Sequence, residues 1–346
     1  MKGISVNLLM TGGGAPGAAG ILQCLKEMEG LHITVADSNP ELAQRYQDTG
    51  FETVPMGTNP SFPDVIQSIC RRKKIDIILP LVTRELLPLS SIRKELEGSG
   101  THLPITGAGS LEIANNKSRL YEFLQWRGIP VPEFRVVETS DQFVAAVTEL
   151  GYPGNPVCFK PSVSNGSRGF RILSENADER DLLFNFKPYH TYIRYDEAVR
   201  ILSSAAFPEL LVSEYLPGEE YSVDCLCKNG EPVLIVPRLR KKMINGISTE
   251  GEVQQQHQVI DYCARIIREL KLHGNAGIQV KRAASGEILL LEINPRVQGT
   301  ISALLGAGIN LPVLAVKQEL NIPISTDETK VRWGTRFTRV WSEIFY

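Results

Sequence analysis

The chain has 346 residues, of which 42% are hydrophobic and 22% are charged, and its formal net charge at pH 7 is −2. This length is too great for one ordinary core and suits two or three packed units. The balanced charge excludes a bulk electrostatic attraction to nucleic acid or to an anionic membrane, so we expect neither as a partner.

The first residues, MKGISVNLLM, carry one lysine and a short apolar run that ends at three glycines. This run is too short for a signal peptide or a membrane span. The six cysteines include no C-x-x-C pair, which indicates reduced thiols rather than a disulfide framework. We therefore expect a cytoplasmic protein without an export signal or an anchor.

Residues 1–110 alternate between two kinds of segment. Strand-like runs (ISVNLLM, HITVADS, IDIILPLV, PITGA) are separated by helix-like runs (AAGILQCLKEME, PDVIQSICRRKK, LLPLSSIRKELE). This alternation is typical of a parallel sheet with crossover helices. The sequence predicts an α/β protein that opens with a Rossmann-like domain.

The glycine-rich stretch TGGGAPGAAG follows the first of these strands. Gly12, Gly14 and Gly17 fit the dinucleotide-binding pattern G-x-G-x-x-G, and Asp37 ends the next apolar run about 20 residues on. A glycine turn also occurs wherever a parallel sheet begins. An NAD-dependent oxidoreductase is therefore one hypothesis, and it rests on this motif alone.

Two further domains are predicted, over residues 111–207 and 208–346. The first has helix-like segments, the strand NPVCFKPSV and the loop SNGSRGFRIL. The second has a hairpin that turns at KNGEP, a helix HQVIDYCARIIRELKL, and two strands joined at Ser285-Gly286. We find no internal repeat.

The segment FKPSVSNGSRGF, residues 159–170, places Lys160 at the end of a strand before a serine- and glycine-rich loop. One fixed cation with several backbone N–H groups suits the oxygens of a triphosphate. A β-turn with a surface lysine is the alternative interpretation.

The segment LVSEYLPGEEYSVD, residues 211–224, can present main-chain groups of Glu214 and Leu216 to an adenine edge. Glu220 is the first choice as acceptor for ribose hydroxyls, with Glu219 in reserve. A solvated turn is the alternative.

The segment IQVKRAASGEILLLEINPRVQG, residues 278–299, carries Gln279 on one strand and Glu292 and Asn294 on the next. Their side chains can converge on one face of a hairpin as oxygen ligands for Mg²⁺. Arg296 adds a guanidinium for a phosphoryl group or a carboxylate. A buried strand with a polar end is the alternative. Burial of Glu292 next to three leucines would, however, cost free energy unless its carboxylate had a partner.

The ordered set Lys117, FKPSVSNGSRG, SEYLPGEE, GIQV and EINPR resembles the ATP-grasp superfamily. It resembles most the synthetase modules of the carbamoyl-phosphate synthetase large subunit and their single-module relatives, which are carboxylate-amine ligases. The resemblance covers about residues 1–315. It implies a Rossmann-like pre-ATP-grasp domain followed by a two-subdomain ATP-grasp fold.

The resemblance implies roles for particular residues. Lys117 and Lys160 would contact the phosphates of ATP, under a loop that includes Ser164, Ser167 and Gly169. Glu214 and Leu216 would hold adenine, and Glu220 the ribose; Gln279, Glu292 and Asn294 would bind Mg²⁺; and Arg296 would face the transferred phosphoryl group. The N-terminal domain would hold no nicotinamide, and the N–H groups of its glycine-rich turn would approach a substrate anion.

The implied reaction has two steps. A small carboxylic acid attacks the γ-phosphoryl group of ATP to give an acyl phosphate, and an amine or amino acid then displaces phosphate. A carboxylate kinase that stops at the acyl phosphate and a non-catalytic ATP sensor remain alternatives. The oligomeric state stays open, although homodimers are common among the proteins it resembles.

A basic segment, PRLRKKMINGISTEGEV (residues 237–253), follows a strand, and in the resembled family it faces the cleft. Arg238 could pair there with the substrate carboxylate, and a solvated basic turn is the alternative. Strand alternation would place Arg238 and Arg240 on one face and Lys241 on the other.

Overall fold

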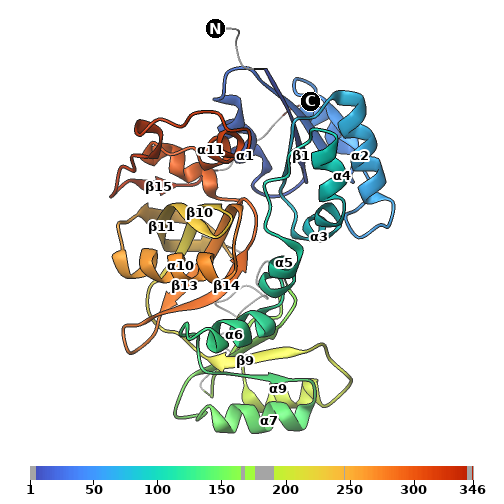
Figure 1. The fold of residues 1–346 in the computed structure, drawn as a ribbon. Coiled ribbons are helices and arrows are strands. Elements are labelled where there is room, and N and C mark those ends of the chain that lie inside the picture. The colour runs from blue at the N-terminus through green and yellow to red at the C-terminus, as the bar shows by residue number, and fades with distance from the viewer. Residues whose placement is uncertain (1–4, 165–167, 176–190, 245, 341–344, 346) are drawn as a thin grey trace. The chain divides into compact units, whose positions relative to one another are not determined.

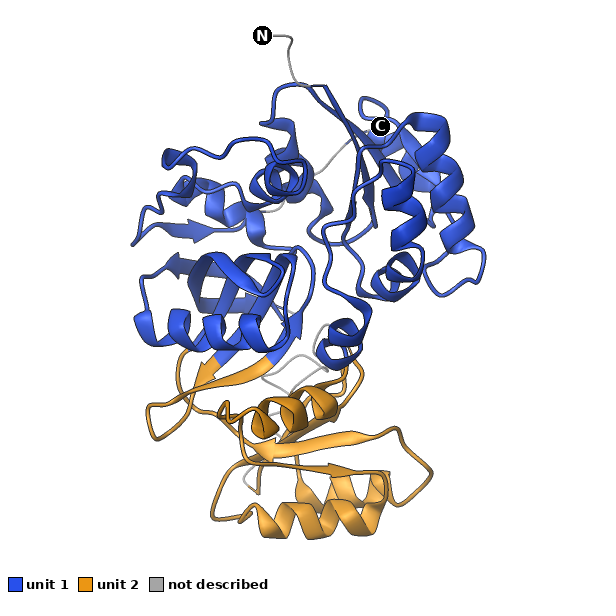
Figure 2. Ribbon diagram, viewed as in Figure 1, with its two compact units in different colours: residues 1–115, 220–280, 292–346 blue, residues 116–219, 281–291 orange. Residues whose placement is uncertain are grey.

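The structure is a computed structural model that describes residues 5–164, 168–175, 191–244, 246–340 and 345. The chain forms two compact units, which Figure 2 shows in different colours. The first unit comprises Met1–Asn115, Glu220–Val280 and Glu292–Tyr346, and the second comprises Asn116–Glu219 and Lys281–Leu291. The expected division into three domains at residues 110 and 207 stays a prediction.

A parallel four-stranded sheet opens the first unit, in the strand order β3-β2-β1-β4 (Figure 1). Its strands are β1 (Val6–Thr11), β2 (Leu31–Asp37), β3 (Phe51–Thr53) and β4 (Ile77–Pro80). The other elements of this region are α1 (Ala18–Lys26), η1 (Pro40–Tyr46), α2 (Phe62–Lys73), α3 (Thr83–Ser91), α4 (Arg93–Gly98) and α5 (Ala108–Ala114). The predicted parallel sheet with crossover helices is confirmed.

The two faces of this sheet have separate cores. Because side chains alternate along a strand, Leu8 and Met10 of β1 face α1, whereas Leu9 faces α2 and α3. The helices that follow β1 and β4 therefore cover opposite faces.

A six-stranded sheet forms the other large part of the first unit, in the order β14-β13-β10-β11-β12-β15. Its strands are β10 (Glu220–Lys228), β11 (Glu231–Ile244), β12 (Ile247–Val253), β13 (Gly274–Arg282), β14 (Ile288–Asn294) and β15 (Arg336–Thr338). The tip of the β13–β14 hairpin is counted in the second unit. Asn229 and Gly230 join β10 to β11 with φ angles of 51° and 92°, which confirms the predicted hairpin turn.

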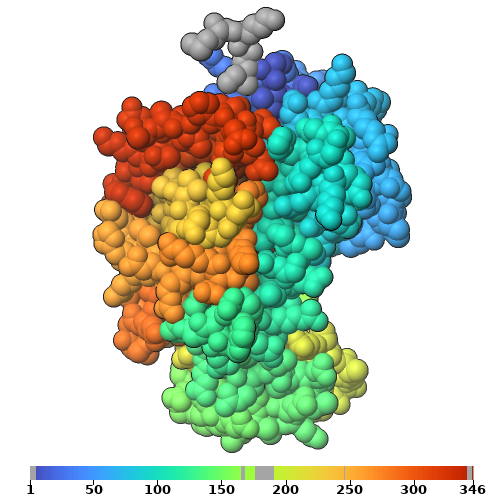
Figure 3. Space-filling model, viewed as in Figure 1, coloured from blue at the N-terminus to red at the C-terminus, as the bar shows by residue number. Residues whose placement is uncertain are grey.

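C-terminal helices complete the core of the N-terminal sheet. The helices of this region are α10 (His257–Glu269), η2 (Ile301–Ala307), α11 (Leu311–Glu319) and η3 (Asp327–Thr329). Ile301, Leu304 and Leu311 belong to the same buried cluster as Leu8 and Met10 of β1. β15 pairs with β12, and in the space-filling view the C-terminal residues (red) lie beside gold residues of the same unit (Figure 3).

The second unit is built on a five-stranded sheet, in the order β5-β9-β6-β7-β8. Its strands are β5 (Phe134–Val137), β6 (Val157–Pro161), β7 (Arg171–Leu173), β8 (Tyr192–Ile193) and β9 (Leu210–Glu214). Among the described residues its helices are α6 (Lys117–Trp126), α7 (Ser140–Glu149) and α9 (Tyr195–Leu202). Phe143 of α7 packs in a buried cluster with Phe159 and Val212. Helix α7 begins with a capping box formed by Thr139 and Gln142.

No single helix in the described parts of the chain is long and apolar enough to cross a bilayer, and η2 and α11 reach that length and composition only as a bent pair.

Candidate functional site

Lys117 and the start of the serine- and glycine-rich loop meet in the second unit. Lys117 is the first residue of α6, and its side chain is buried. Its Nζ donates to the carbonyl oxygen of Ser164 at 2.7 Å and lies 3.3 Å from the Ser164 hydroxyl. The structure thus brings together two of the groups expected at the phosphates, although they lie 47 residues apart in the chain.

Lys160 lies on β6 and reaches toward β14. Its Nζ donates to the carbonyl oxygen of Leu291 at 2.9 Å and lies 5.6 Å from the centre of the Tyr121 ring. The Tyr121 hydroxyl donates to the neighbouring carbonyl oxygen of Leu290 at 2.6 Å. Sequence reasoning missed Tyr121, whose only signal is its position one helical turn after Lys117.

The loop after β6 requires glycine at Gly169. This residue has a φ angle of 76°, and a Cβ atom there would lie 2.6 Å from Cδ of Pro161. The expected loop residue Ser167 lies outside the described residues.

The expected adenine residues are Glu214, the last residue of β9, and Leu216, two residues after it. A Glu214 carboxylate oxygen accepts from the backbone N–H of Glu133 at 2.9 Å, and Glu214 lines a groove of about 400 Å³. Leu216 is buried in a small cluster with Ala283 and Leu289. The structure therefore fixes both residues within the second unit.

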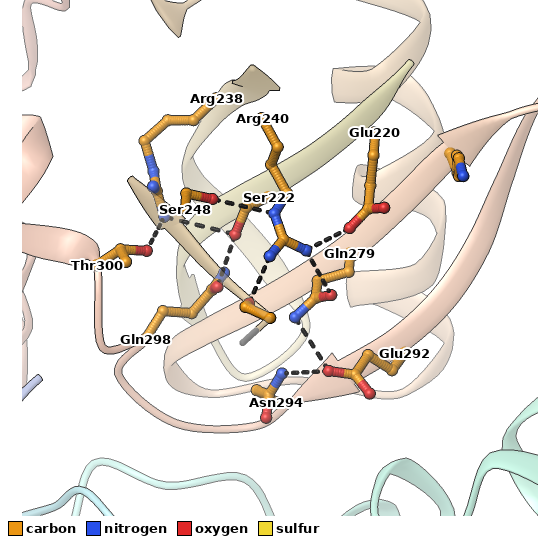
Figure 4. Close-up of polar contacts among 12 residues, drawn as sticks. Glu220, Ser222, Arg238, Arg240, Ser248, Gln279, Glu292, Asn294, Gln298 and Thr300 are labelled. Atoms are coloured by element: carbon orange, nitrogen blue, oxygen red, sulfur yellow. Dashed lines mark hydrogen bonds and ion pairs between the residues drawn. The ribbon is translucent and has the colours of Figure 1, made fainter. Parts of the chain in front are cut away.

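The three expected metal ligands converge in the first unit (Figure 4). Oε1 of Glu292 accepts from Nε2 of Gln279 at 3.0 Å and from Nδ2 of Asn294 at 3.2 Å. Carboxylate oxygens suit a hard cation, so Glu292 fits Mg²⁺. The two amide oxygens instead accept from Arg240 and Arg296, and they would have to be released before they could bind a metal. Glu292 supplies the one negative charge of this set, so a cation there would need further charge from a phosphate.

Arg296 extends the same hydrogen-bonded network. Its Nη2 donates to Oδ1 of Asn294 at 3.2 Å, and its Nε donates to Oγ1 of Thr83 at 3.0 Å. Burial lowers the pKa of Arg296, and the nearby Glu292 opposes that shift. The guanidinium therefore stands beside the proposed metal ligands and the first turn of α3.

Arg240 lies at the opposite end of this network, whereas the sequence analysis placed it only in the basic segment expected to face the substrate. Its Nη1 donates to Glu220 in a short ion pair and to Oε1 of Gln279 at 3.2 Å. Its Nε donates to Ser248 at 3.0 Å, and its Nη2 donates to the Gly246 carbonyl oxygen at 2.5 Å. Arg240 therefore links the expected ribose acid to an expected metal ligand, as Figure 4 shows.

The expectation that Arg238 contacts a substrate carboxylate requires correction. Its side chain is 1% exposed, and its Nε donates to a carboxylate oxygen of the equally buried Asp224 at 2.5 Å. Its Nη2 donates to Oγ1 of Thr300 at 2.9 Å. The alternative of a solvated basic turn is also wrong for Arg238, although exposed Lys241 does lie on the opposite strand face.

The glycine-rich turn does not offer the N–H groups that we expected for a substrate anion. Gly13 donates to the carbonyl oxygen of Ala36, Gly14 donates to the Asp37 carboxylate at 2.7 Å, and Ala15 donates to the carbonyl oxygen of Gly12. These donors are occupied within the chain, so the expectation is wrong for them.

The glycines of this segment instead permit close packing. Gly12 has a φ angle of 77°, and a Cβ atom on Gly17 would lie 2.2 Å from Cα of Gly299. The positive φ angle of Gly12 and the close approach of Gly17 to Gly299 both disfavour larger residues. Neither feature requires a bound dinucleotide.

Family comparisons agree with this fold. Residues 206–341 match the family described as "ATP-grasp in the biosynthetic pathway with Ter operon", and residues 8–104 match "PylC-like, N-terminal domain". The C-terminal part of the chain is therefore similar to an ATP-grasp family, and the N-terminal part is similar to a PylC-like N-terminal domain. The predicted resemblance and the predicted α/β fold class are confirmed.

Curated relatives are carbamoyl phosphate synthase large chains. That of Methanobrevibacter smithii is 23% identical over 317 residues, which cover 87% of this chain and 28% of the relative. That of Gemmatimonas aurantiaca is 22% identical over 324 residues, which cover 89% of this chain and 28% of the relative. The chain spans about 28% of the length of these relatives.

Solved structures share the fold. An N5-carboxyaminoimidazole ribonucleotide synthetase in complex with ADP has a TM-score of 0.69 at 19% identity, over 96% of this chain and 81% of that one. An L-amino acid ligase from Bacillus licheniformis has a TM-score of 0.64 at 16% identity, over 96% of this chain and 78% of that one.

Proposed function

We propose that the protein is an ATP- and Mg²⁺-dependent ligase that joins a small carboxylic acid to an amine or amino acid through an acyl phosphate. The observation that carries this proposal is the convergence of Gln279, Glu292 and Asn294, with Arg296 hydrogen-bonded to the same group. The names of similar proteins, which include an L-amino acid ligase and a structure with ADP, support the same chemistry.

The residues of this chain would bind and orient the reactants. Lys117 and Lys160 would supply positive charge for phosphate oxygens, and Glu292 would hold the metal, with its two amide neighbours beside it. Bound Mg²⁺ would neutralise charge on the phosphates of ATP. Arg296 would stabilise the charge that develops on the transferred phosphoryl group.

The first test is incubation with Mg-ATP, pooled amino acids and other small carboxylic acids. Mass spectrometry would follow ADP, phosphate and any product equal to acid plus amine less water. Glu292→Ala should abolish that product, and Glu287→Ala, which changes an exposed carboxylate just before the same strand, should not.

The outcomes separate the alternatives. ADP without a condensed product, independent of added amine, would indicate a carboxylate kinase. ATP binding without turnover in every pool would indicate a sensor and contradict the ligase.

A further inference from the structure

The guanidinium of Arg240 lies among oxygen atoms that come from separate parts of the six-stranded sheet (Figure 4). It donates to a carboxylate, an amide, a hydroxyl and a backbone carbonyl oxygen, which belong to Glu220 of β10, Gln279 of β13, Ser248 of β12 and Gly246 just before β12. A guanidinium has five N–H donors, so four of them have an oxygen partner here. This arrangement is more than an ion pair between two side chains.

These oxygen atoms are largely enclosed. The side chain of Arg240 is 6% exposed, that of Glu220 is 15% exposed, and Ser248 is buried. A carboxylate that is held out of water costs free energy unless an opposite charge lies beside it. The guanidinium supplies that charge and holds the four oxygens together.

The backbone of β11 directs Arg240 into this position. Arg240 pairs with Gly251 of β12, and the register of the two strands shifts between Arg240 and Lys242. Such a bulge re-aims side chains. The Arg240 side chain runs from this point toward the turn of the hairpin and reaches the Gly246 carbonyl oxygen, whereas the side chain of Lys241 is exposed.

The chemistry of these four oxygens is that of a cation site. Carboxylate and carbonyl oxygens are the ligands that hard cations prefer. Glu220 carries one negative charge, and the amide, hydroxyl and backbone oxygens are neutral. A monovalent cation balances this charge, whereas a divalent cation would leave a positive charge unbalanced.

We infer that these oxygens form a site for a monovalent cation and that the guanidinium of Arg240 is its permanent occupant. This inference goes beyond the proposed ligase function, because it concerns how the chain is held before any substrate binds. A cation that is covalently attached cannot dissociate. When the Arg240 side chain is removed, the site should therefore accept a free monovalent cation.

The occupant of this site also holds two residues that are expected near the nucleotide. Glu220 is the expected acceptor for ribose hydroxyls. The amide of Gln279 accepts from Arg240 through its oxygen and donates from its nitrogen to the Glu292 carboxylate at 3.0 Å. Loss of the cation should therefore disturb both the ribose acid and the carboxylate of the proposed metal site.

Chemical rescue tests the inference. Arg240→Ala removes the atoms of an N-ethylguanidinium ion, so this ion can refill the site, and N-ethylurea is a neutral molecule of similar shape. Without nucleotide, acid or amine, we expect N-ethylguanidinium at about ten times its Kd to raise the thermal unfolding midpoint of Arg240→Ala by on the order of 2 °C. N-ethylurea should leave this midpoint unchanged. Wild type and Lys241→Ala, which alters an exposed side chain, should respond to neither compound.

The rescue should extend to nucleotide binding. We expect Arg240→Ala to bind MgADP about 10-fold more weakly than wild type, the lower range for residues that orient metal ligands, and N-ethylguanidinium to reverse most of this loss. Isothermal titration calorimetry would measure both Kd values. Neither measurement requires turnover, so a failed rescue would leave the ligase function standing, and an inactive enzyme would leave the cation site standing.

Each outcome decides the question. Equal rescue by N-ethylurea would show that the site requires shape rather than charge, and it would overturn the inference. A folded Arg240→Ala protein that N-ethylguanidinium does not stabilise would overturn it as well. If Arg240→Ala does not fold, its yield on refolding from urea decides: N-ethylguanidinium must raise the yield and N-ethylurea must not, and equal yields would contradict the cation site.

Discussion

Arg240 makes contacts that a shorter or neutral side chain could not reproduce. It donates to Glu220, Ser248, Gln279 and Gly246, and its side chain is 6% exposed. Because Oε1 of Gln279 accepts from Arg240, the Gln279 amide turns its nitrogen toward Glu292. Arg240 therefore positions Glu292, the carboxylate of the proposed metal site, through the Gln279 amide.

Replacement of Arg240 should weaken the proposed metal site. We expect Arg240→Met to raise the Mg²⁺ concentration for half-maximal activity by about 10- to 100-fold, the range for residues that orient metal ligands. Arg240→Lys should recover part of this loss. Lys241→Met is the matched control, because Lys241 is exposed and pairs with Glu252. A Mg²⁺ dependence equal to that of the control would refute the positioning role.

The Arg238–Asp224 ion pair should contribute to stability rather than to substrate binding. Oδ1 of Asp224 and Nη1 of Arg238 are buried, and neither atom has a hydrogen-bond partner among the residues that the structure describes. Removal of one member of a buried pair typically costs about 3–5 kcal/mol, whereas replacement of both by apolar groups costs far less. We expect Arg238→Met to lower the free energy of unfolding by that amount in urea titrations, and Arg238→Met with Asp224→Leu to recover most of it. A folded, equally stable Arg238→Met protein with an altered KM would contradict this.

Glu85 should make stability depend on pH without any substrate. Burial raises its folded-state pKa to about 7, above the ordinary value of 4.5, so the folded protein holds this proton more tightly than the unfolded chain. The free energy of unfolding should therefore fall as pH rises from about 4.5 to 7, by on the order of 3 kcal/mol. Urea titrations of wild type and Glu85→Gln should diverge across this range, and parallel curves would show that the shift is absent.

Helix α1 packs closely against the C-terminal part of the first unit because glycines lie at the points of contact. Gly17 precedes α1, and any Cβ atom there would meet the backbone of Gly299. The matching pair Gly20 and Ser302 lies one helical turn further on, where a Cβ atom would lie 2.5 Å from the Ser302 hydroxyl oxygen. These approaches explain why small residues recur along this helix.

Gly17→Ala should therefore force the start of α1 away from the backbone of Gly299. We expect a loss of about 1–3 kcal/mol in the free energy of unfolding, as for other overpacked positions. Gly109→Ala is the control: Gly109 lies in α5 and a Cβ atom there meets nothing within 4 Å, so helix propensity should stabilise the variant by up to about 1 kcal/mol. Equal stabilities of the two variants in chemical denaturation would be the contrary result.

At the level of the whole molecule, nucleotide binding can distinguish an ATP-dependent ligase from the NAD-dependent oxidoreductase that the glycine-rich motif suggested. A ligand at 100 times its Kd stabilises a protein by about 2.7 kcal/mol. We expect MgADP to raise the thermal unfolding midpoint and NADH to leave it unchanged, and we expect Lys160→Ala to reduce the MgADP effect. Stabilisation by NADH alone would favour the oxidoreductase.

Local patterns in the sequence predicted much of this molecule, because strand alternation and turn chemistry are short-range signals. They predicted the parallel sheet, the Asn229-Gly230 turn and the convergence of Glu292 with its amide neighbours. Pairings over long separations escaped prediction: Thr11 and Glu85 lie 74 residues apart, and Tyr121 and Leu290 lie 169 apart. Arg238 was misjudged because its partner Asp224 lies on another strand, and no local pattern reveals such a pairing.

The N-terminal sheet and the C-terminal helices of the first unit share one buried core, and this arrangement affects folding during synthesis. One face of the N-terminal sheet is covered partly by η2 and α11, which the ribosome adds only after residue 300. Until then Leu8 and Met10 lack much of their apolar cover. We therefore expect the nascent chain to expose part of this hydrophobic surface until its C-terminal residues have been added.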